Sequence, residues 1–372
     1  MADGFGFKMT APKTADEVIP FITEDGRVGN VIHVVRSDSS GTAPTAPPRG
    51  PVLLIAGSGV RANIFRAPVD VTIVDALLDD GFDVWLENWR ASIDFAPNEW
   101  TLDEAAVFDH PAGVRTVLEH TGRDQLKALV HCQGSTGFMM AATAGLLPEV
   151  TTIVSNAVSL HPVVPRLARM KLDWFHRPIR ALTRYLDPHW GVEAPDAVAK
   201  AITALVRVVH RECTNTPCRI ASFTYGVGHP TLWSHALLND ATHEWVKQEF
   251  GPVPLTFFYQ MTKCVDAGHL VAANHFPQLP TTFGVDAPRT DATITLMAGQ
   301  ENACFLAESQ ERTFDYFSEK GKGQYDLHVI PEYGHLDMFM GKDAARDVFP
   351  TILDPTGPQG RRLQIAACIR SG

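Results

Sequence analysis

The stretch Ala128–Gly137 reads ALVHCQGSTG and decides the fold prediction for the whole chain. It begins inside Leu126–His131, an apolar run that predicts a buried strand, and small residues then lead into Phe138–Leu147, which is typical of a helix. A strand that turns sharply into a helix through small residues exposes one side chain at its corner, an arrangement called the nucleophile elbow. In this chain the corner residue is Cys132.

The usual pattern of this turn is G-x-S-x-G, because the turn is crowded and the residues two before and two after the nucleophile are small. Gly134 meets the second requirement, whereas Val130 does not meet the first. A buried structural cysteine is the alternative interpretation of Cys132, since free cysteine is common in protein cores. The strand before it, the glycine, and the helix N-terminus after it, which favours a thiolate, make Cys132 the candidate nucleophile.

The segments around this turn alternate between strand and helix. Apolar runs predict strands at 51–57, 82–87, 126–131, 293–299 and 325–330, and helical spacing predicts helices at 69–79, 103–119, 138–147 and 309–320, with a closing helix after Asp343. Strands that alternate with helices are typical of βαβ units and of a mostly parallel sheet flanked by helices. The small, Pro-rich stretch 37–50 predicts a loop.

The middle of the chain interrupts this alternation. Residues 161–288 are richer in aromatic side chains, histidine and arginine, and they lose the rhythm of strand and helix. We therefore expect a largely helical cap that is inserted into an α/β core. The predicted organisation is the first part of the core at residues 1–160, the cap or lid at 161–288, and the second part of the core at 289–372.

A cysteine at such a turn needs a base, and a loop histidine far downstream is the candidate. Pro331–Asp337, PEYGHLD, follows the last expected strand and places His335 on a loop before the closing helix. The order nucleophile, acid, histidine along the chain fits this position. His131 precedes Cys132 directly, and we expect it to point away from the nucleophile and to serve as a packing residue.

The third member of the site orients the imidazole from a loop after the preceding strand. Met297–Phe305, MAGQENACF, offers Glu301 and Asn302 there. The usual spacing, Gly-x-x-Asp counted from Gly299, puts Asn302 at the acid position, whereas chemistry favours the carboxylate of Glu301. Cysteine enzymes also use asparagine as the orienting residue, so we favour Asn302 and keep Glu301 as the alternative.

Two backbone N–H groups should form an oxyanion hole. One comes from the residue after the nucleophile, Gln133, and the other from the loop after the first strong strand, Ala56–Phe65, AGSGVRANIF, where Ser58 is the expected donor. A glycine-rich turn after a strand also suggests a nucleotide site. This one lacks both the G-x-G-x-x-G spacing and the terminal Lys-Ser/Thr of a phosphate-binding loop, so we expect no cofactor.

Bulk composition narrows the class of protein further. The net charge of −10, from 32 Lys+Arg and 42 Asp+Glu, argues against a nucleic-acid partner, which needs clustered positive charge. The apolar stretches fall short of the ~20 residues that span a bilayer, so we expect no membrane span. The N-terminus, MADGFGFKMTAPKTADE, lacks the apolar region of a secretion signal, and we expect a cytoplasmic protein.

Six cysteines are spread over the 372 residues, too few for a disulfide scaffold. They are Cys132, Cys213, Cys218, Cys264, Cys304 and Cys368. Cys213 and Cys218 are close enough in sequence to pair, or to bind a metal if partners come near. No second Cys/His pair with ligand-like spacing accompanies them, so the sequence predicts no metal site.

Several of these segments resemble known families. Between Leu53 and Gly145 the chain resembles the acid lipase branch of the α/β hydrolases: GFDVWLENWR is similar to their GYDVWLGNSRG, and the run from DEAAVFDHPA to HCQGSTG is similar to their run from DEMAKYDLPA into GHSQGTT. YGHLDMF, at Tyr333–Phe339, resembles their histidine segment.

A closer resemblance, over most of the chain, is to the α/β-hydrolase domain found alone or fused to cholesterol-oxidase-like flavoproteins. The shared segments are GVRAN, HC-x-GS, LN-x-x-TH (Leu238, Asn239, Thr242 and His243), GxEN and GHLD. The resemblance implies an α/β-hydrolase fold, Cys132 as nucleophile, His335 as base, and Gln133 and Ser58 as oxyanion donors. It also suggests a functional link to a flavin oxidoreductase, although no dinucleotide motif is present in this chain.

The expected chemistry is acyl transfer through an acyl-cysteine, as in an esterase or thioesterase acting on a small hydrophobic ester or thioester. One alternative is an acyltransferase or condensing enzyme, because a thioester stays reactive toward amines, alcohols and thiols. Another is a non-catalytic pseudo-hydrolase that binds a ligand or partner. The Phe, Trp, Leu and Val of the cap suggest a hydrophobic acyl or sterol-like substrate, and they fit plain packing of the cap equally well.

Overall fold

The computed structural model describes residues 14–36, 47–174, 179–226 and 231–354. Most of the loop expected at 37–50 lies outside the described residues, as does Cys368. No helix in the described ranges is both long enough and apolar enough to cross a membrane.

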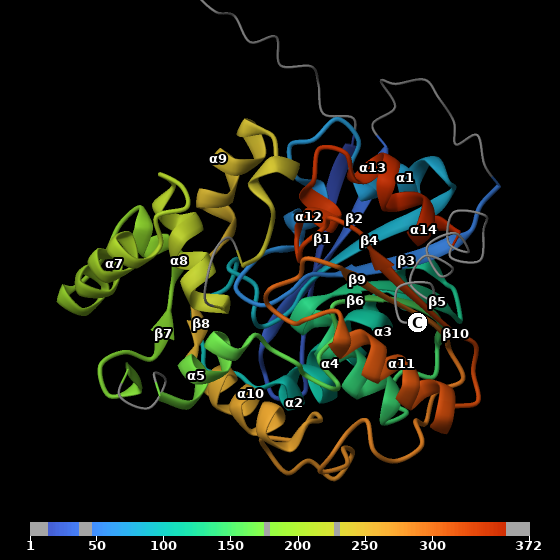
Figure 1. The fold of residues 1–372 in the computed structure, drawn as a ribbon. Coiled ribbons are helices and arrows are strands. Elements are labelled where there is room, and N and C mark those ends of the chain that lie inside the picture. Colours follow the sequence, from blue (N-terminus) through green and yellow to red (C-terminus); the bar gives the residue numbers. More distant parts are fainter. Residues whose placement is uncertain (1–13, 37–46, 175–178, 227–230, 355–372) are drawn as a thin grey trace, which may run out of the picture.

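An eight-stranded sheet forms the centre of the molecule (Figure 1). Its spatial order is β1 (Thr14–Ile22), β2 (Val28–Arg36), β4 (Phe82–Asn88), β3 (Gly50–Ile55), β5 (Leu126–His131), β6 (Val150–Asn156), β9 (Thr293–Gly299) and β10 (Tyr325–Ile330). The six strands from β4 to β10 run parallel to one another, and the hairpin β1–β2 is added antiparallel at the edge beside β4. The prediction of a mostly parallel sheet is confirmed.

The five expected strands are all present, and three further strands of this sheet were not expected. β5, β9 and β10 have the bounds that the apolar runs predict, and β3 and β4 agree within two residues. β1, β2 and β6 lack such runs. Along β1 most side chains are exposed or half-buried, as is typical of an edge strand, so its sequence carries little apolar signal.

Helices cover both faces of the sheet (Figure 1). One face carries α3 (His110–Thr121), α4 (Cys132–Thr143) and α11 (Glu308–Lys320), and the other carries α1 (Ile73–Asp79) with the C-terminal α13 (Ala344–Asp347) and α14 (Phe349–Leu353). The helix expected at 103–119 is continuous but has three parts, because α2 (Leu102–Glu104) and the π-helical turn η3 (Ala105–Asp109) precede α3. Because helices cover β3 on both faces, its residues Leu53, Leu54 and Ile55 are fully buried. Burial on both faces also explains why the sequence of this strand is an apolar run.

The chain between β6 and β9 is largely helical, as expected. It contains α5 (Arg166–Trp174), β7 (Tyr185–Leu186), η4 (Pro188–Gly191), α7 (Ala197–Val209), α8 (Thr216–Tyr225), η5 (His235–Leu237), α9 (Asp240–Glu249), β8 (Val253–Pro254) and α10 (Leu255–Ala267). In Figure 1 these elements lie beside and below the sheet. The boundaries of the cap at 161 and 288 stay a prediction.

Candidate active site

The backbone at Cys132 is bent into a strained corner between β5 and α4. Cys132 has a φ of 56°, in the left-handed region that residues with a Cβ rarely adopt. Small neighbours make room for the corner: a Cβ on Gly134 would lie 2.1 Å from the Ala56 carbonyl oxygen, and one on Gly57 would lie 2.9 Å from the Cys132 Cβ. Val130, where the usual pattern has glycine, is fully buried in β5. Strain of this kind is typical of functional sites.

His335 lies on the loop that joins β10 to α12 (Asp337–Met340), beside the loop that follows β9. The two loops approach closely because Gly299 has no side chain: a Cβ there would lie 2.0 Å from the carbonyl oxygen of Gly334. This packing carries His335 to the corner of the elbow. The cysteine sulfur and one nitrogen each from His131 and His335 all lie within 4.8 Å of one another.

Asn302 contacts His335, and Glu301 does not. The Asn302 Nδ2 lies 3.1 Å from Nδ1 of His335. The orientation of this amide is fixed, because its Oδ1 accepts hydrogen bonds from the N–H groups of Cys304 at 3.0 Å and Phe305 at 3.2 Å. Glu301 is exposed on the same loop. The structure therefore places the favoured orienting residue, Asn302, against His335 and leaves the alternative, Glu301, out of contact with it.

The direction of this hydrogen bond decides where His335 carries its proton. An amide NH₂ group only donates, so Nδ1 of His335 accepts, and the proton of the neutral ring sits on Nε2. Nε2 is buried and has no hydrogen-bond partner among the described residues. The resting ring is therefore neutral, with its proton on the nitrogen that a general base would use.

Both members of the cysteine–histidine pair are neutral at rest. Burial, and then the neighbouring His131, lower the pKa of His335 well below its ordinary value. Burial raises the pKa of the Cys132 thiol to about 12. The sequence suggested that the helix N-terminus would favour a thiolate. In this enclosed corner, however, the free-energy cost of burying the thiolate charge exceeds the stabilisation that the helix N-terminus provides.

Two backbone N–H groups lie against the Cys132 sulfur, those of Gln133 and Ser58, and both lower the pKa of the thiol. They are the two oxyanion donors that the sequence predicts. The peptide of Ser58 is further held from the cap, because the hydroxyl of Tyr225 donates to the Ser58 carbonyl oxygen at 2.7 Å. Gly59 permits this contact, since a Cβ there would lie 2.6 Å from the Tyr225 hydroxyl. The cap therefore contacts the loop after β3 directly.

His131 does not point away from the site, contrary to the expectation from sequence. Its ring centroid lies 4.5 Å from that of His335. Its Nδ1 donates to Oδ1 of Asn156, at the end of β6, at 2.8 Å. Burial lowers the pKa of His131 to about 4, so the ring is neutral. His131 therefore packs against His335 and disfavours a positive charge there.

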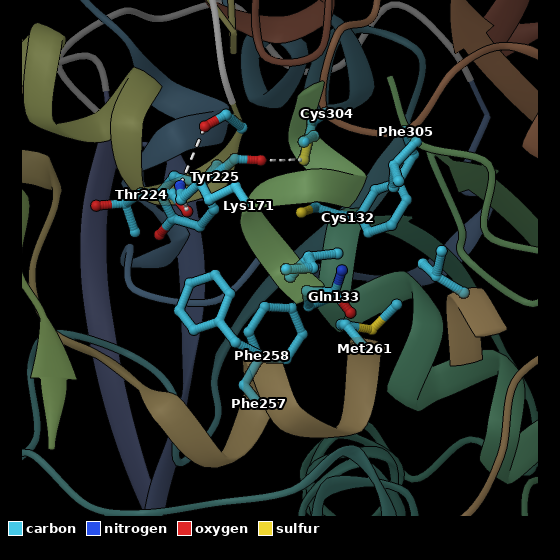
Figure 2. Close-up of a pocket in the computed structure, with 15 residues that line it drawn as sticks. Cys132, Gln133, Lys171, Thr224, Tyr225, Phe257, Phe258, Met261, Cys304 and Phe305 are labelled. Atoms are coloured by element: carbon cyan, nitrogen blue, oxygen red, sulfur yellow. Dashed lines mark hydrogen bonds between the residues drawn. The ribbon is translucent and has the colours of Figure 1, made fainter. Parts of the chain in front are cut away.

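An apolar pocket lies beside Cys132 (Figure 2). Helices α5, α8 and α10 supply most of its wall, and the start of α4 and the loop after β9 also contribute. Its lining residues are Cys132, Gln133, Val164, Ala168, Lys171, Leu172, Thr224, Tyr225, Gly226, Phe257, Phe258, Met261, Val265, Cys304 and Phe305. Most of these side chains are aliphatic or aromatic, so the pocket suits an apolar group attached to the atom that the cysteine attacks.

Among the described residues that line this pocket, Lys171 has the one charged side chain. Its ammonium donates to the carbonyl oxygens of Phe223, Thr224 and Gly226, at the C-terminal end of α8. Burial lowers the pKa of Lys171 to about 7, and Cys304 opposes this shift. The lysine thus holds the end of the helix that carries the pocket wall.

Sequence reasoning missed Tyr225 and Lys171 because neither belongs to a local motif. Tyr225 reaches a loop 167 residues earlier in the chain, and only the packing of α8 on the core brings the two together. The one available signal was the abundance of aromatic residues in the cap, which does not single out any residue.

No protein-family model matches the chain. Among curated proteins, it is 23% identical to lipase member K of Mus musculus over 365 residues, which cover 89% of this chain and 85% of that protein. It is 30% identical to the lysosomal acid lipase/cholesteryl ester hydrolase of Macaca fascicularis over 123 residues, 30% of this chain and 29% of that protein.

Solved structures show the same architecture. A thermostable carboxyl esterase from Bacillus coagulans matches with a TM-score of 0.55 and 12% identity, over 91% of this chain and 97% of that one. A thermophilic esterase from Thermogutta terrifontis matches with a TM-score of 0.51 and 14% identity, over 90% and 96%. The chain has the α/β-hydrolase fold, and the lipase relatives support its place in that superfamily.

Proposed function

We propose that this α/β-hydrolase-fold chain is an esterase-type hydrolase that forms an acyl-cysteine on Cys132, with His335 as general base and Asn302 as the residue that orients it. The observation that carries the proposal is the strained corner at Cys132, whose sulfur faces two backbone N–H groups and an apolar pocket. The lipase and cholesteryl ester hydrolase relatives support an ester as substrate.

The first half of the reaction acylates the cysteine. The Cys132 sulfur forms a bond to the ester carbonyl carbon while the thiol proton moves to Nε2 of His335. The carbonyl oxygen becomes an oxyanion, and the N–H groups of Gln133 and Ser58 stabilise it. The ester C–O bond then breaks, and His335 returns the proton to the departing alkoxide. In the second half a water molecule attacks the thioester carbonyl carbon while His335 takes its proton. The C–S bond then breaks, the proton returns to the Cys132 sulfur, and the carboxylic acid leaves.

The resting tautomer of His335 has to change before this proton transfer. Nε2 must present a lone pair to the thiol, so the ring proton must lie on Nδ1, and Asn302 must then turn Oδ1 toward it. That turn gives up the hydrogen bonds from Cys304 and Phe305, each worth about 1 kcal/mol. We infer that asparagine at this position keeps the intrinsic rate low compared with a carboxylate.

The lining of the pocket supports a substrate with a hydrophobic acyl chain. Phe257, Phe258 and Met261 of α10 face the cavity from one side (Figure 2). A straight acyl chain of medium length has no polar group beyond its carbonyl, so it can lie against these apolar side chains without leaving polar groups unpaired. Activated esters and thioesters of such acids are therefore the substrates that we propose.

A series of p-nitrophenyl esters, from acetate to laurate, tests this function. We expect kcat/KM to rise from acetate to a medium chain, and Cys132→Ala to lose the activity while circular dichroism shows an intact fold. A Cys132→Ala variant that hydrolyses the esters at the rate of the unmodified protein would refute the proposal.

A ligand-binding role without turnover is the second candidate, and the resting tautomer favours it. A ring held with its proton on Nε2 and a buried neutral thiol is an inactive pair. The two roles differ in a simple mixing experiment. A catalyst releases p-nitrophenolate repeatedly, whereas a binding protein releases none, although fatty acid still protects it against thermal unfolding.

A further inference from the structure

Four metal-binding side chains meet in the cap, away from the pocket. Cys213 lies on the loop before α8, Cys218 in the first turn of α8, His235 in η5 and His243 in α9. One ligand atom from each lies within 4.8 Å of every other. We call these four residues the cap cluster. In Figure 1 their elements lie at the end of the molecule where α7, α8 and α9 gather.

We propose that the cap cluster binds one Zn²⁺ ion. Two thiolates and two imidazoles are a complete tetrahedral set for zinc. Around a bound zinc the ligand atoms lie roughly 3.3 to 3.8 Å apart, as follows from Zn–S and Zn–N bonds of about 2.3 and 2.0 Å. A contraction of about 1.5 Å or less therefore brings the four atoms onto one ion.

The contacts inside the cluster fit this ligand set. The Cys218 sulfur lies 3.4 Å from Nε2 of His235. The rings of His235 and His243 meet edge to face, with centroids 4.8 Å apart. Nε2 of His243 is buried and has no hydrogen-bond partner among the described residues. A buried imidazole nitrogen without a partner, beside two thiols, is explained by a ligand that binds all of them.

Asn215 joins the segments that carry the ligands. Its Oδ1 accepts from the N–H of Cys218 at 3.2 Å, and its Nδ2 donates to the His243 carbonyl oxygen at 2.7 Å. The loop before α8 is thus tied to α9 by hydrogen bonds. Such outer contacts hold the ligands of a metal site in place.

A disulfide between Cys213 and Cys218 is the competing explanation for the two thiols. The five cysteines in the described part of the chain are all free. A disulfide would also leave the approach of His235 and His243 without a cause. With four protein ligands the ion has no open position, so its role is structural and not catalytic.

The zinc would fix the wall of the pocket through α8. Cys218 stands in the first turn of this helix, and Tyr225 ends it. Tyr225 lines the pocket and donates to the Ser58 carbonyl oxygen. The proposed ion therefore anchors the N-terminal end of α8, and Tyr225 at the other end of this helix contacts the Ser58 loop.

Metal content measured by inductively coupled plasma mass spectrometry tests the proposal. We expect about one zinc per chain in the full-length protein and in Cys132→Ser and Cys264→Ser, and loss of zinc in Cys213→Ser and His243→Ala. Cys132→Ser is the matched control, because Cys132 belongs to the other cysteine–histidine cluster.

Two further measurements use the unmodified protein and follow metal binding directly. They therefore depend neither on enzymatic activity nor on whether the variants fold. Cobalt added to the chelator-treated protein should give the visible absorption of a tetrahedral thiolate site, and zinc should raise its thermal midpoint. The proposal is overturned if zinc is lost in Cys132→Ser and kept in Cys213→Ser. It is equally overturned if the chelator-treated protein takes up no metal, or if peptide mapping finds a Cys213–Cys218 disulfide in protein purified without reductant.

Discussion

Two cysteine–histidine clusters of similar composition lie in this molecule and are built in opposite ways. The active-site cluster, His131, Cys132 and His335, stands on the rigid edge of the sheet with one thiol facing an open pocket. The cap cluster stands on helices and loops of the cap, and its two thiols and two imidazoles lie close together, away from the pocket beside Cys132. An open cluster leaves room for a substrate, whereas a closed one suits an ion that holds the fold together.

The two clusters also differ in what fixes their geometry. At Cys132 the backbone itself is strained, and glycines on the neighbouring loops permit the close approach. In the cap cluster side-chain hydrogen bonds from Asn215 join the segments. We expect changes in the first cluster to alter rate without unfolding the chain, and changes in the second to alter stability first.

The largest expected effect is on turnover. Cys132→Ala and His335→Ala should each lower kcat/KM of ester hydrolysis by roughly 10³-fold or more, and the double variant should be no worse than the single ones, because the two residues act as one unit. Steady-state kinetics with a medium-chain p-nitrophenyl ester measures this. Losses that add in the double variant would show that the two side chains act separately.

The next largest expected effect is on thermal stability, and it distinguishes the cap cluster from the active-site cluster. Cys213→Ser should lower the thermal midpoint by several degrees, since a ligand that binds only the folded state contributes to its stability. Its kcat/KM at low temperature should fall by less than about tenfold, because Tyr225 and not the reacting groups is displaced. Differential scanning calorimetry, with and without added zinc, provides the measurement. An unchanged midpoint together with a full loss of activity would contradict this division of roles.

Replacing Asn302 by aspartate tests the tautomer argument. Unlike the other changes at the site, this one is expected to raise kcat/KM. In Asn302→Asp the carboxylate accepts from Nδ1–H of His335 and still accepts from Cys304 and Phe305, so we expect kcat/KM to rise by about tenfold. A carboxylate also raises the pKa of His335, and the base must be neutral to work. The acid limb of the pH–rate profile should therefore move to higher pH.

In the unmodified protein the acid limb of the pH–rate profile should lie well below pH 6.5, since the pKa of His335 is lowered. Asn302→Ala should lower kcat/KM by about tenfold, because the ring loses its orienting contact. An Asn302→Asp variant with an unshifted limb and an unchanged rate would show that the amide does not restrain the histidine.

The smallest effect is expected at Glu301. This side chain is exposed and makes no contact with His335, so Glu301→Ala should leave both rate and pH profile unchanged. It is the matched control for Asn302→Ala, one residue away on the same loop. A shift of the acid limb in Glu301→Ala alone would reverse the assignment of the orienting residue.

The sequence was informative wherever structure is dictated locally. The elbow follows from an apolar strand, a small residue at Gly134 and a helix, all within 22 residues, and β5 has the predicted bounds. The strands covered by helices on both faces, β3 and β9, are visible as apolar runs. The hairpin β1–β2 is not, because most of β1 is exposed and β2 mixes buried residues with more exposed ones, so neither needs an unbroken apolar run.

The sequence was silent wherever contacts span the chain. Seven residues separate His235 from His243, more than the three to five that usually separate a zinc-binding pair, and only the packing of α9 against α8 brings them to the cysteines. The choice between Asn302 and Glu301 depended on two backbone N–H groups that turn the amide inward. Neither the closeness of His131 to His335 nor the neutral state of Cys132 could be predicted without knowing how deeply the corner is buried.

The most direct test of the account is to trap the acyl group. The protein is mixed with excess p-nitrophenyl octanoate, quenched in acid within the first turnovers, digested and mapped by mass spectrometry. We predict one octanoyl group on the peptide that contains Cys132, and none in Cys132→Ala. Repeated release of octanoate with Cys132 unmodified, or with the octanoyl group on Cys304 or Ser135 instead, would contradict the account.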